Sequence, residues 1–317
     1  MTYAITVAIA TFRRPAGIVS ALTSVLPQAG DLAARPNSDV SVRVLVIDND
    51  PEASGRDAVA PFAVDYVHEP KPGIAAVRNR ALAECSADDA LIFLDDDEVA
   101  TEGWLSALVT RHRTTGADAV AGRVRTDFPR GTDPWVRASG AFRRPVRVDG
   151  QLMDEAATNN LLIDLGTVRR LGLRFDEAFG LTGGSDSLFT RQLVALGGTI
   201  RWAQDALVIE LEDQERFNRS WVLMRVFRFG NTSTRVDIAL AQTAPGRLLV
   251  RGARLLRGLA RVFGGGLRAS WGVVTGSLSH RARGFRTIYR GAGMIAGAGG
   301  FAFSEYGARR KRMGISS

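Results

Sequence analysis

The chain has 317 residues, which is enough for one large α/β domain with an appendage or for two modest domains. Its content of 45% hydrophobic and 23% charged residues is that of a globular protein and excludes a chain that is disordered throughout. A single cysteine, Cys85, excludes an intramolecular disulfide framework, and three scattered histidines argue against a His-rich zinc site.

The net charge of +8 conceals two oppositely charged parts. Residues 1–215 carry a net charge of −9, whereas residues 216–317 hold 19 basic and 2 acidic side chains and a net charge of +17. This asymmetry predicts that the two parts meet different partners. The first residues lack a basic leader segment and no apolar run is long enough to cross a bilayer, so we expect neither a signal peptide nor a transmembrane helix.

Apolar runs of strand length alternate with segments of helical periodicity through most of the chain. Such alternation predicts an α/β domain. In chain order, we expect a strand at 3–10, a helix opened by Pro15, strands at 42–47 and 64–67, a helix at 74–85, a strand at 91–94, a helix at 102–114, a strand at 117–124, a long loop at 125–154, a strand at 156–164, helices to 171 and at 187–196, a strand at 206–211, and helices at 220–229 and 247–263.

The most informative stretch is 91–98, where four apolar residues run directly into Asp95, Asp96, Asp97 and Glu98. The apolar run is typical of a strand buried on both faces, and the carboxyl ends of such strands are where open α/β sheets bind ligands. Clustered carboxylates repel one another unless a cation or hydrogen-bond donors offset their charge. We therefore interpret the cluster as a site for Mg²⁺ or another divalent cation, the alternative being a solvated acidic turn.

Other polar residues also follow expected strands. Thr11, Phe12 and Arg13 come after the first strand, and Asp48 ends the second. Arg78 lies near the start of the next helix, where a guanidinium can meet phosphate oxygens, although a solvated helix surface would also hold such a residue.

A glycine-rich turn at 180–184 presents Ser185 and Asp186 at the start of a helix. A carboxylate on such a turn is suited to act as a general base. Taken alone, however, Ser or Asp at this position is more often a helix N-cap.

The basic part contains an amphipathic helix at 247–263, in which arginines recur every three or four residues opposite Leu, Val and Phe. One interpretation is that this helix binds an anionic membrane surface. The other is that it docks on the α/β domain as an ordinary amphipathic helix.

Five motifs follow one another along the chain: ATFRRP at 10–15, VIDND at 46–50, GIAAVRN at 73–79, FLDDDE at 93–98, and FDE at 175–177 followed by GGSD at 183–186. There is no G-x-G-x-x-G and no P-loop to suggest a dinucleotide fold of the usual kind or a P-loop protein. In this order the five motifs resemble the family 2 glycosyltransferases, most closely the bacterial branch that builds exopolysaccharide and succinoglycan-type repeats. The resemblance covers about residues 3–230.

The resemblance implies an α/β GT-A fold, with a Rossmann-like, mostly parallel sheet flanked by helices. It places the catalytic domain at 1–235 and leaves a basic helical extension at 236–317. It also implies a nucleotide-diphospho-sugar donor, most commonly a UDP-sugar in this family, together with Mg²⁺ or Mn²⁺ and inversion at the anomeric carbon.

The family's functional residues map onto this chain motif by motif. By resemblance, Thr11, Phe12, Arg13, Asp48, Arg78, Asp95 and Asp96 contact the donor nucleotide. Asp97, with Asp95, corresponds to the metal-binding carboxylates, and Asp186 corresponds to the general base. Ser185 replaces a glutamate that is common in the family, which puts an acceptor contact in doubt. Further candidates for sugar or acceptor contacts are Arg123, Trp135 and Asn160.

Two other functions stay open from the residues alone. A sugar-1-phosphate nucleotidylyltransferase also uses metal-binding aspartates, but an early glycine-rich phosphate loop is missing. A non-enzymatic protein that binds nucleic acid or membrane through its basic tail is the other, although the tail is poor in aromatic residues and we expect no nucleic-acid partner. The leading hypothesis is a cytoplasmic enzyme, peripheral at the inner face of the cell membrane, with a glycan or lipid-linked acceptor.

Overall fold

The computed structural model describes residues 2–36, 38–145, 147–211 and 214–304. The chain forms two compact units. The first comprises Met1–Thr126, Pro145–Leu181 and Ser185–Leu211, and the second comprises Asp127–Arg144, Thr182–Gly184 and Glu212–Ser317. The domain boundary that the sequence suggests, at residue 235, falls inside helix α8 (Arg219–Leu240).

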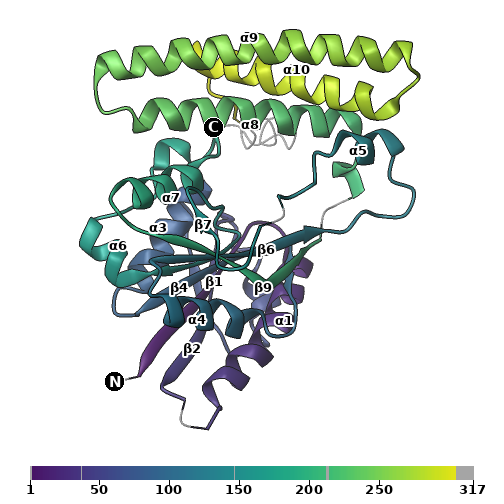
Figure 1. The fold of residues 1–317 in the computed structure, drawn as a ribbon. Helices are drawn as coiled ribbons and strands as arrows, with labels where there is room; N and C mark the ends of the chain where they lie inside the picture. The colour runs from purple at the N-terminus through teal and green to yellow at the C-terminus, as the bar shows by residue number, and fades with distance from the viewer. Residues whose placement is uncertain (1, 37, 146, 212–213, 305–317) are drawn as a thin grey trace. The chain divides into compact units, whose positions relative to one another are not determined.

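Across the described residues, nine strands form one sheet in the first unit, in the order β3-β2-β1-β4-β8-β6-β9-β5, with β7 paired to β9 (Figure 1). The first four strands pair in parallel, as do β6 and β9, whereas β8, β5 and β7 pair antiparallel to their neighbours. The sheet is therefore mixed. The strands are β1 (Tyr3–Thr11), β2 (Val40–Asp48), β3 (Asp65–His68), β4 (Ala90–Asp95), β5 (Glu98–Ala100), β6 (Ala119–Thr126), β7 (Leu152–Met153), β8 (Asn160–Asp164) and β9 (Ile200–Glu210).

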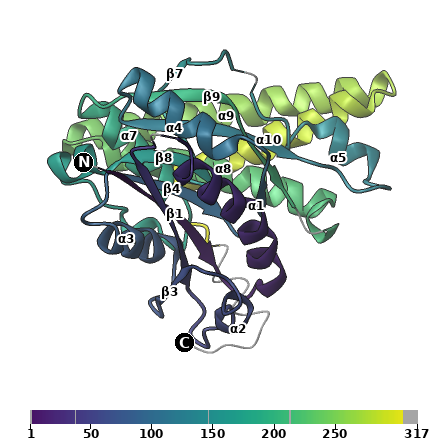
Figure 2. The ribbon, with the colours of Figure 1, turned by 90° about the horizontal axis from the view of Figure 1, so that it is seen from below.

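Helices cover both faces of this sheet. Alternate residues of β4 show why, because Ile92 and Leu94 pack into one core while Leu91 and Phe93 pack into the other. Helices α1 and α4 supply the first core, and α3, α6 and α7 supply the second, so that α1 and α3 lie on opposite sides of β1 (Figure 2). The helices of this unit are α1 (Pro15–Ala33), α2 (Arg56–Val59), α3 (Ile74–Glu84), α4 (Trp104–Thr115), α6 (Leu165–Leu171) and α7 (Ser185–Ala195), with a short 3-10 turn at Glu177–Phe179.

The second unit is helical. It contains α5 (Pro134–Ser139), α8, α9 (Ala244–Val274), α10 (Leu278–Ala298) and a 3-10 turn at Gln214–Arg216. Helix α10 packs against both α8 and α9 (Figure 1). The approach is close because glycines line the contact: a Cβ at Gly293 would lie 2.0 Å from the carbonyl oxygen of Phe227. Within the described residues no helix is both long and apolar enough to span a membrane.

Part of the stretch expected to be a long loop, 125–154, is ordered as α5 and β7. Asp133 caps α5 by accepting a hydrogen bond from the backbone nitrogen of Trp135 at 2.8 Å, and it also pairs with Arg219 at 2.6 Å. An aromatic cluster of Trp135, Phe142 and Phe217 then holds the segment within the second unit. Widely spaced aromatic residues give no periodic signal, so the sequence pattern misses this small core.

Candidate active site

The acidic stretch lies where the sequence predicts it. Strand β4 ends at Asp95. The next two residues, Asp96 and Asp97, form a turn, and Glu98 begins β5. The carboxyl ends of β1, β2 and β4 are adjacent because these strands run parallel. Thr11, at the end of β1, accordingly donates a hydrogen bond from Oγ1 to Asp96 Oδ2 at 2.9 Å.

Arg14 offsets much of the charge of this turn. Its Nη1 lies 3.1 Å from Asp96 Oδ1 and 2.5 Å from Asp97 Oδ2. The two carboxylates raise the pKa of the Arg14 guanidinium despite its partial burial. The Arg14 guanidinium therefore supplies positive charge that offsets the repulsion between these two carboxylates.

Two carboxyl groups of the stretch have displaced pKa values. Burial, together with the nearby Asp97 and Asp96, raises the pKa of Asp95 to about 7, although Arg78 opposes this rise. Burial, with Asp95, Asp97 and Glu210, raises the pKa of Glu98 well above its usual value. Glu98 is 1% exposed. It is held by Asn159, whose Nδ2 donates to Glu98 Oε1 at 2.6 Å.

The raised pKa of Glu98 predicts a loss of stability with rising pH. The carboxyl of Glu98 ionises near pH 4.3 in the unfolded chain and at a higher pH in the folded one, so the stability present below pH about 4.3 is lost as pH rises towards the raised pKa of the folded state. Every tenfold difference between the acid dissociation constants of the two states costs the folded protein about 1.4 kcal/mol at neutral pH. Glu98→Gln removes this loss, and we expect its unfolding midpoint to exceed that of the wild type at pH 7.5 but not at pH 4.5, measured without divalent cations.

Glu102→Gln is the matched control, because Glu102 is exposed and lies on the same segment. It should follow the wild type at both pH values. A Glu98→Gln variant that is less stable than the wild type at pH 7.5 would contradict the raised pKa of Glu98 in the folded protein.

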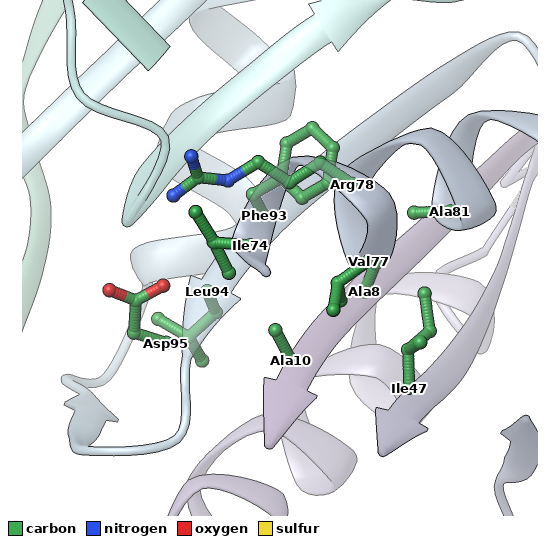
Figure 3. A pocket seen from close by; sticks show the side chains of 10 residues that line it. All are labelled: Ala8, Ala10, Ile47, Ile74, Val77, Arg78, Ala81, Phe93, Leu94 and Asp95. Carbon is green, nitrogen blue, oxygen red and sulfur yellow. The ribbon is translucent and has the colours of Figure 1, made fainter. Parts of the chain in front are cut away.

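Arg78 of α3 and Asp95 line a small pocket between α3, β1 and β4 (Figure 3). Their charged groups lie on the same side of the pocket, with Ile74 between them. The Arg78 guanidinium is fixed by Phe175, whose ring centroid is 5.6 Å away, and by Ser185, whose Oγ accepts from Nη1 at 3.0 Å. Ser185 is fully buried, so its side chain holds Arg78 instead of facing an acceptor.

Asp48 faces the interior. It is fully buried, and its carboxylate accepts hydrogen bonds from the backbone nitrogens of Asp50 and Gly55, at 2.9 and 2.7 Å, and from Tyr66 Oη at 3.0 Å. Asp48 therefore shapes the loop after β2. The contact of Asp48 with a base or ribose stays a prediction.

Arg13 and Phe12 flank the same edge of the sheet. Arg13 has a φ of 54°, a conformation that costs about 1 kcal/mol or more for a non-glycine residue. Its Nε donates to Asp50 Oδ1 at 3.1 Å, and the guanidinium carbon lies 5.4 Å from the centroid of the Phe12 ring. Phe12 is 39% exposed, so its ring remains available to a planar ligand.

Asp186 lies in the first turn of α7, which directly follows two glycines with positive φ, Gly183 at 76° and Gly184 at 101°. Only glycine adopts these angles without strain. Helix α7 begins at Ser185, which places Asp186 inside the first turn and not at the N-cap. Its side chain is half-buried, and Oδ1 accepts from the backbone nitrogen of Ser187 at 2.8 Å. This hydrogen bond orients one carboxylate oxygen of Asp186, while the carboxylate stays partly exposed.

The three remaining candidates have different surroundings. Arg123 is exposed on β6. The amide of Asn160 is committed to the fold, since Oδ1 accepts from Trp104 Nε1 at 2.8 Å and Nδ2 donates to the carbonyl oxygens of Arg123 and Ala206 at 3.0 and 2.8 Å. Trp135 is buried in the second unit. The roles of Arg123, Trp135 and Asn160 in sugar or acceptor binding stay predictions.

Sequence reasoning misses Arg14, Asp50 and Asn159 as partners of the site. Arg13 and Arg14 are adjacent and chemically identical, so no pattern separates the one that reaches the acidic turn from the one that pairs with Asp50. The two adjacent asparagines at 159–160 indicate a polar site, but only Asn160 is predicted as a contact, whereas Asn159 is the one that donates a hydrogen bond to Glu98.

The donor set suits a cation that is shared with a ligand. Asp95 and Asp97 lie on the same turn and both offer oxygen, the atom that Mg²⁺ and Mn²⁺ prefer. In the described part of the chain no group of three or more His, Cys, Asp or Glu side chains encloses a metal site.

Comparison with known proteins identifies relatives across most of the chain. Residues 6–167 match the family model for Glycosyl transferase family 2. The succinoglycan biosynthesis protein ExoM of Rhizobium meliloti (strain 1021) is 36% identical over 253 residues, which cover 77% of this chain and 78% of that protein.

Solved structures share the fold at low sequence identity. The mannosyltransferase PcManGT of Pyrobaculum calidifontis, solved with GDP-Man and Mn²⁺, has a TM-score of 0.62 and 16% identity, covering 94% of this chain and 87% of that one. GalNAc-T7, solved with UDP, GalNAc and Mn²⁺, has a TM-score of 0.53 and 13% identity, covering 76% of this chain but only 52% of its own. These neighbours confirm the GT-A fold. The chain is a glycosyltransferase and belongs to glycosyl transferase family 2, in the branch that contains an exopolysaccharide biosynthesis protein.

Proposed function

We propose that this glycosyltransferase inverts the anomeric carbon as it moves a sugar from a nucleotide-diphospho-sugar to a hydroxyl of a glycan or lipid-linked acceptor. The observation that carries the proposal is the acidic turn 95–97, at the carboxyl ends of three parallel strands in a family 2 chain. Four groups of different function lie on this edge of the sheet: the turn itself, Thr11, the Arg78 guanidinium and the exposed Phe12 ring.

We assign Mg²⁺ or Mn²⁺ to Asp97 and Asp95. Such an ion, when bound, offsets the negative charge that develops on the departing diphosphate. Arg14 pairs with Asp97 and Asp96, so the ion must compete with a guanidinium for Asp97. Both solved neighbours named above contain Mn²⁺, which supports a metal-dependent donor site.

The donor nucleotide is assigned to the edge formed by Thr11, Phe12 and Arg13. Phe12 offers an exposed ring to a base, and Arg78 offers a fixed positive charge beside Asp95. UDP is our proposed nucleotide, in line with the UDP of GalNAc-T7, while the GDP-Man of the mannosyltransferase makes GDP its competitor.

Asp186 is assigned as the general base. Its half-buried carboxylate is oriented by the Ser187 nitrogen and remains able to take a proton from an acceptor hydroxyl. The hydroxyl oxygen attacks the anomeric carbon from the face opposite the diphosphate, and the C–O bond to the diphosphate breaks. A single displacement of this kind inverts the configuration and needs no covalent enzyme intermediate.

We place the acceptor at the cytoplasmic face of the membrane. The relative named for succinoglycan biosynthesis supports an acceptor of the glycan class. The basic helices of the second unit support attraction to anionic lipids, which would bring the enzyme to a lipid-linked acceptor.

The test is a transfer reaction with a panel of nucleotide-sugars, a lipid-linked glycan fraction and Mn²⁺. The expected result is release of a nucleoside diphosphate from one donor, with a product whose anomeric configuration, read by NMR coupling, is opposite to that of the donor. Retention of configuration would overturn the inverting assignment. Release of pyrophosphate from a nucleoside triphosphate and a sugar 1-phosphate would instead identify a nucleotidylyltransferase.

A further inference from the structure

Helix α9 exposes a continuous apolar face. The face it turns to α10 consists of small buried residues, Gly258, Gly265, Ala269 and Gly272. The opposite side carries ten large apolar residues that are 40% to 79% exposed. They are Leu248, Leu249, Leu255, Leu256, Leu259, Phe263, Leu267, Trp271, Val273 and Val274, and we call them the α9 apolar face.

The position of the face follows from helical periodicity. Residues such as 256, 263, 267 and 274 recur at intervals of seven, four and seven, which keeps them on one side of an α-helix. Figure 1 shows α9 along one edge of the group formed by α8, α9 and α10, with α10 as the helix between the others. Among the residues that the structure describes in this unit, neither α8 nor α10 covers the α9 apolar face.

The surroundings of the face are strongly basic. Helices α9 and α10 together contain ten arginines and neither aspartate nor glutamate. Several arginines are close enough to repel one another: burial, with Arg290, Arg283, Arg268 and Arg261, lowers the pKa of Arg286. On the helical wheel, Arg257, Arg261 and Arg268 border the apolar face along one edge.

We propose that the α9 apolar face enters the acyl boundary of an anionic bilayer, with the bordering arginines on lipid phosphates. A helix that lies in the membrane–water interface has a wide apolar side, a basic border and more charge than a helix that spans the bilayer, and α9 has all three features. Trp271 and the long arginine side chains suit the region of the headgroups, where an apolar body and a polar end are both accommodated. The inference rests on the proposed action at a membrane and identifies the surface that makes the contact.

The apolar face and its basic border together argue against two other partners, a second copy of the chain and a nucleic acid. A second copy of the chain would bring a second set of the bordering arginines Arg257, Arg261 and Arg268 to the same contact, so like charges would oppose the pairing. A nucleic acid would satisfy the arginines, but its phosphate backbone offers nothing to ten exposed apolar side chains. An anionic bilayer complements both the apolar and the basic parts.

The experiment measures binding of the full chain to vesicles of phosphatidylcholine alone and of phosphatidylcholine with phosphatidylglycerol, without donor or acceptor. We expect binding to the anionic vesicles only. In the double variant Leu256→Ser and Leu267→Ser, the partition coefficient should fall about tenfold for each leucine removed. In Arg257→Gln with Arg261→Gln it should fall roughly fivefold for each arginine.

The matched control is Leu152→Ser with Leu196→Ser, because these leucines are also exposed, at 56% and 55%, but belong to the first unit. It should bind as the wild type does. Insertion has a separate readout in Trp271, which is 58% exposed: its emission should shift to the blue on anionic vesicles, and the shift should be lost in Trp271→Phe.

Three outcomes would overturn the inference. One is binding that survives the leucine variant but not the arginine variant, which indicates attraction without insertion. The others are a dimer in solution that the leucine variant dissociates, and salt-sensitive capture of RNA in preference to vesicles. Transfer to a soluble acceptor by a protein that fails to bind vesicles would refute this inference alone, and vesicle binding without transfer would refute the proposed activity alone.

Discussion

Asp186→Asn should lower kcat for sugar transfer by about two to four orders of magnitude while leaving the affinity for the donor nucleotide unchanged. The amide has the shape of the carboxylate and its Oδ1 can still accept from the Ser187 nitrogen, so the first turn of α7 should persist. An amide cannot accept the proton of an acceptor hydroxyl at neutral pH, which removes the proposed general base. Steady-state kinetics and nucleotide titration on the same preparation separate the two effects.

Asp186→Asn also distinguishes a general base from a residue that only caps helix α7. Asparagine caps a helix about as well as aspartate, so a residue that only caps would lose neither activity nor stability on this change. The matched control is Glu155→Gln, since Glu155 reaches the same helix end through Ser187 Oγ at 2.6 Å and is exposed. We expect it to keep most of its activity. If Glu155→Gln is the variant that loses transfer and Asp186→Asn is not, the base is Glu155.

The acidic stretch is predictable because local pattern and chemistry agree there. An apolar run followed directly by carboxylates predicts both a buried strand and the edge at which it ends, and β4 with its turn has this structure. Helix α3 ends within one residue of its expected end for a similar reason, since its Ala-rich stretch follows a Pro-Gly turn.

The pairing of strands and the limits of some strands are harder to predict from the sequence. The sequence predicts β8 as a strand, but nothing in its apolar residues tells that it enters between β4 and β6 in the antiparallel sense. The beginning of β9 escapes prediction because Arg201, Gln204 and Asp205 interrupt its apolar pattern. Strand partners and edges depend on tertiary packing, which a single sequence does not display.

The same limit applies within the site. The resemblance implies that Asp48 contacts the nucleotide, but it does not indicate that Gly55 and Tyr66, from outside β2, donate hydrogen bonds to its carboxylate. At Ser185 the sequence suggests a lost acceptor contact, but Arg78 reaches this side chain from 107 residues away in the chain. In both cases a distant partner decides what a polar side chain does.

Asp97 offers the sharpest test of the donor site, because its partners in the fold are known. With Mn²⁺ and one nucleoside diphosphate at about 100 times its dissociation constant, we expect the wild type to gain about 2.7 kcal/mol of stability, visible as a raised unfolding midpoint. Asp97→Asn should lose this gain, because one of the two proposed metal carboxylates is replaced by a neutral amide that binds a divalent cation weakly.

Without ligand, Asp97→Asn removes one partner of Arg14 but leaves its contact with Asp96 at 3.1 Å, so the fold should survive. Asp205→Asn is the matched control, since Asp205 is an exposed carboxylate of the same unit, and it should respond to the nucleotide as the wild type does. If the stability gain persists in Asp97→Asn but disappears when Mn²⁺ is chelated, the metal binds to oxygens other than those of Asp97. Asp95 would then be the first residue to test. A nucleotide response that does not depend on the metal would mean that the Arg14 guanidinium serves the diphosphate in its place, because Arg14 already pairs with Asp97, one of the two carboxylates assigned to the metal.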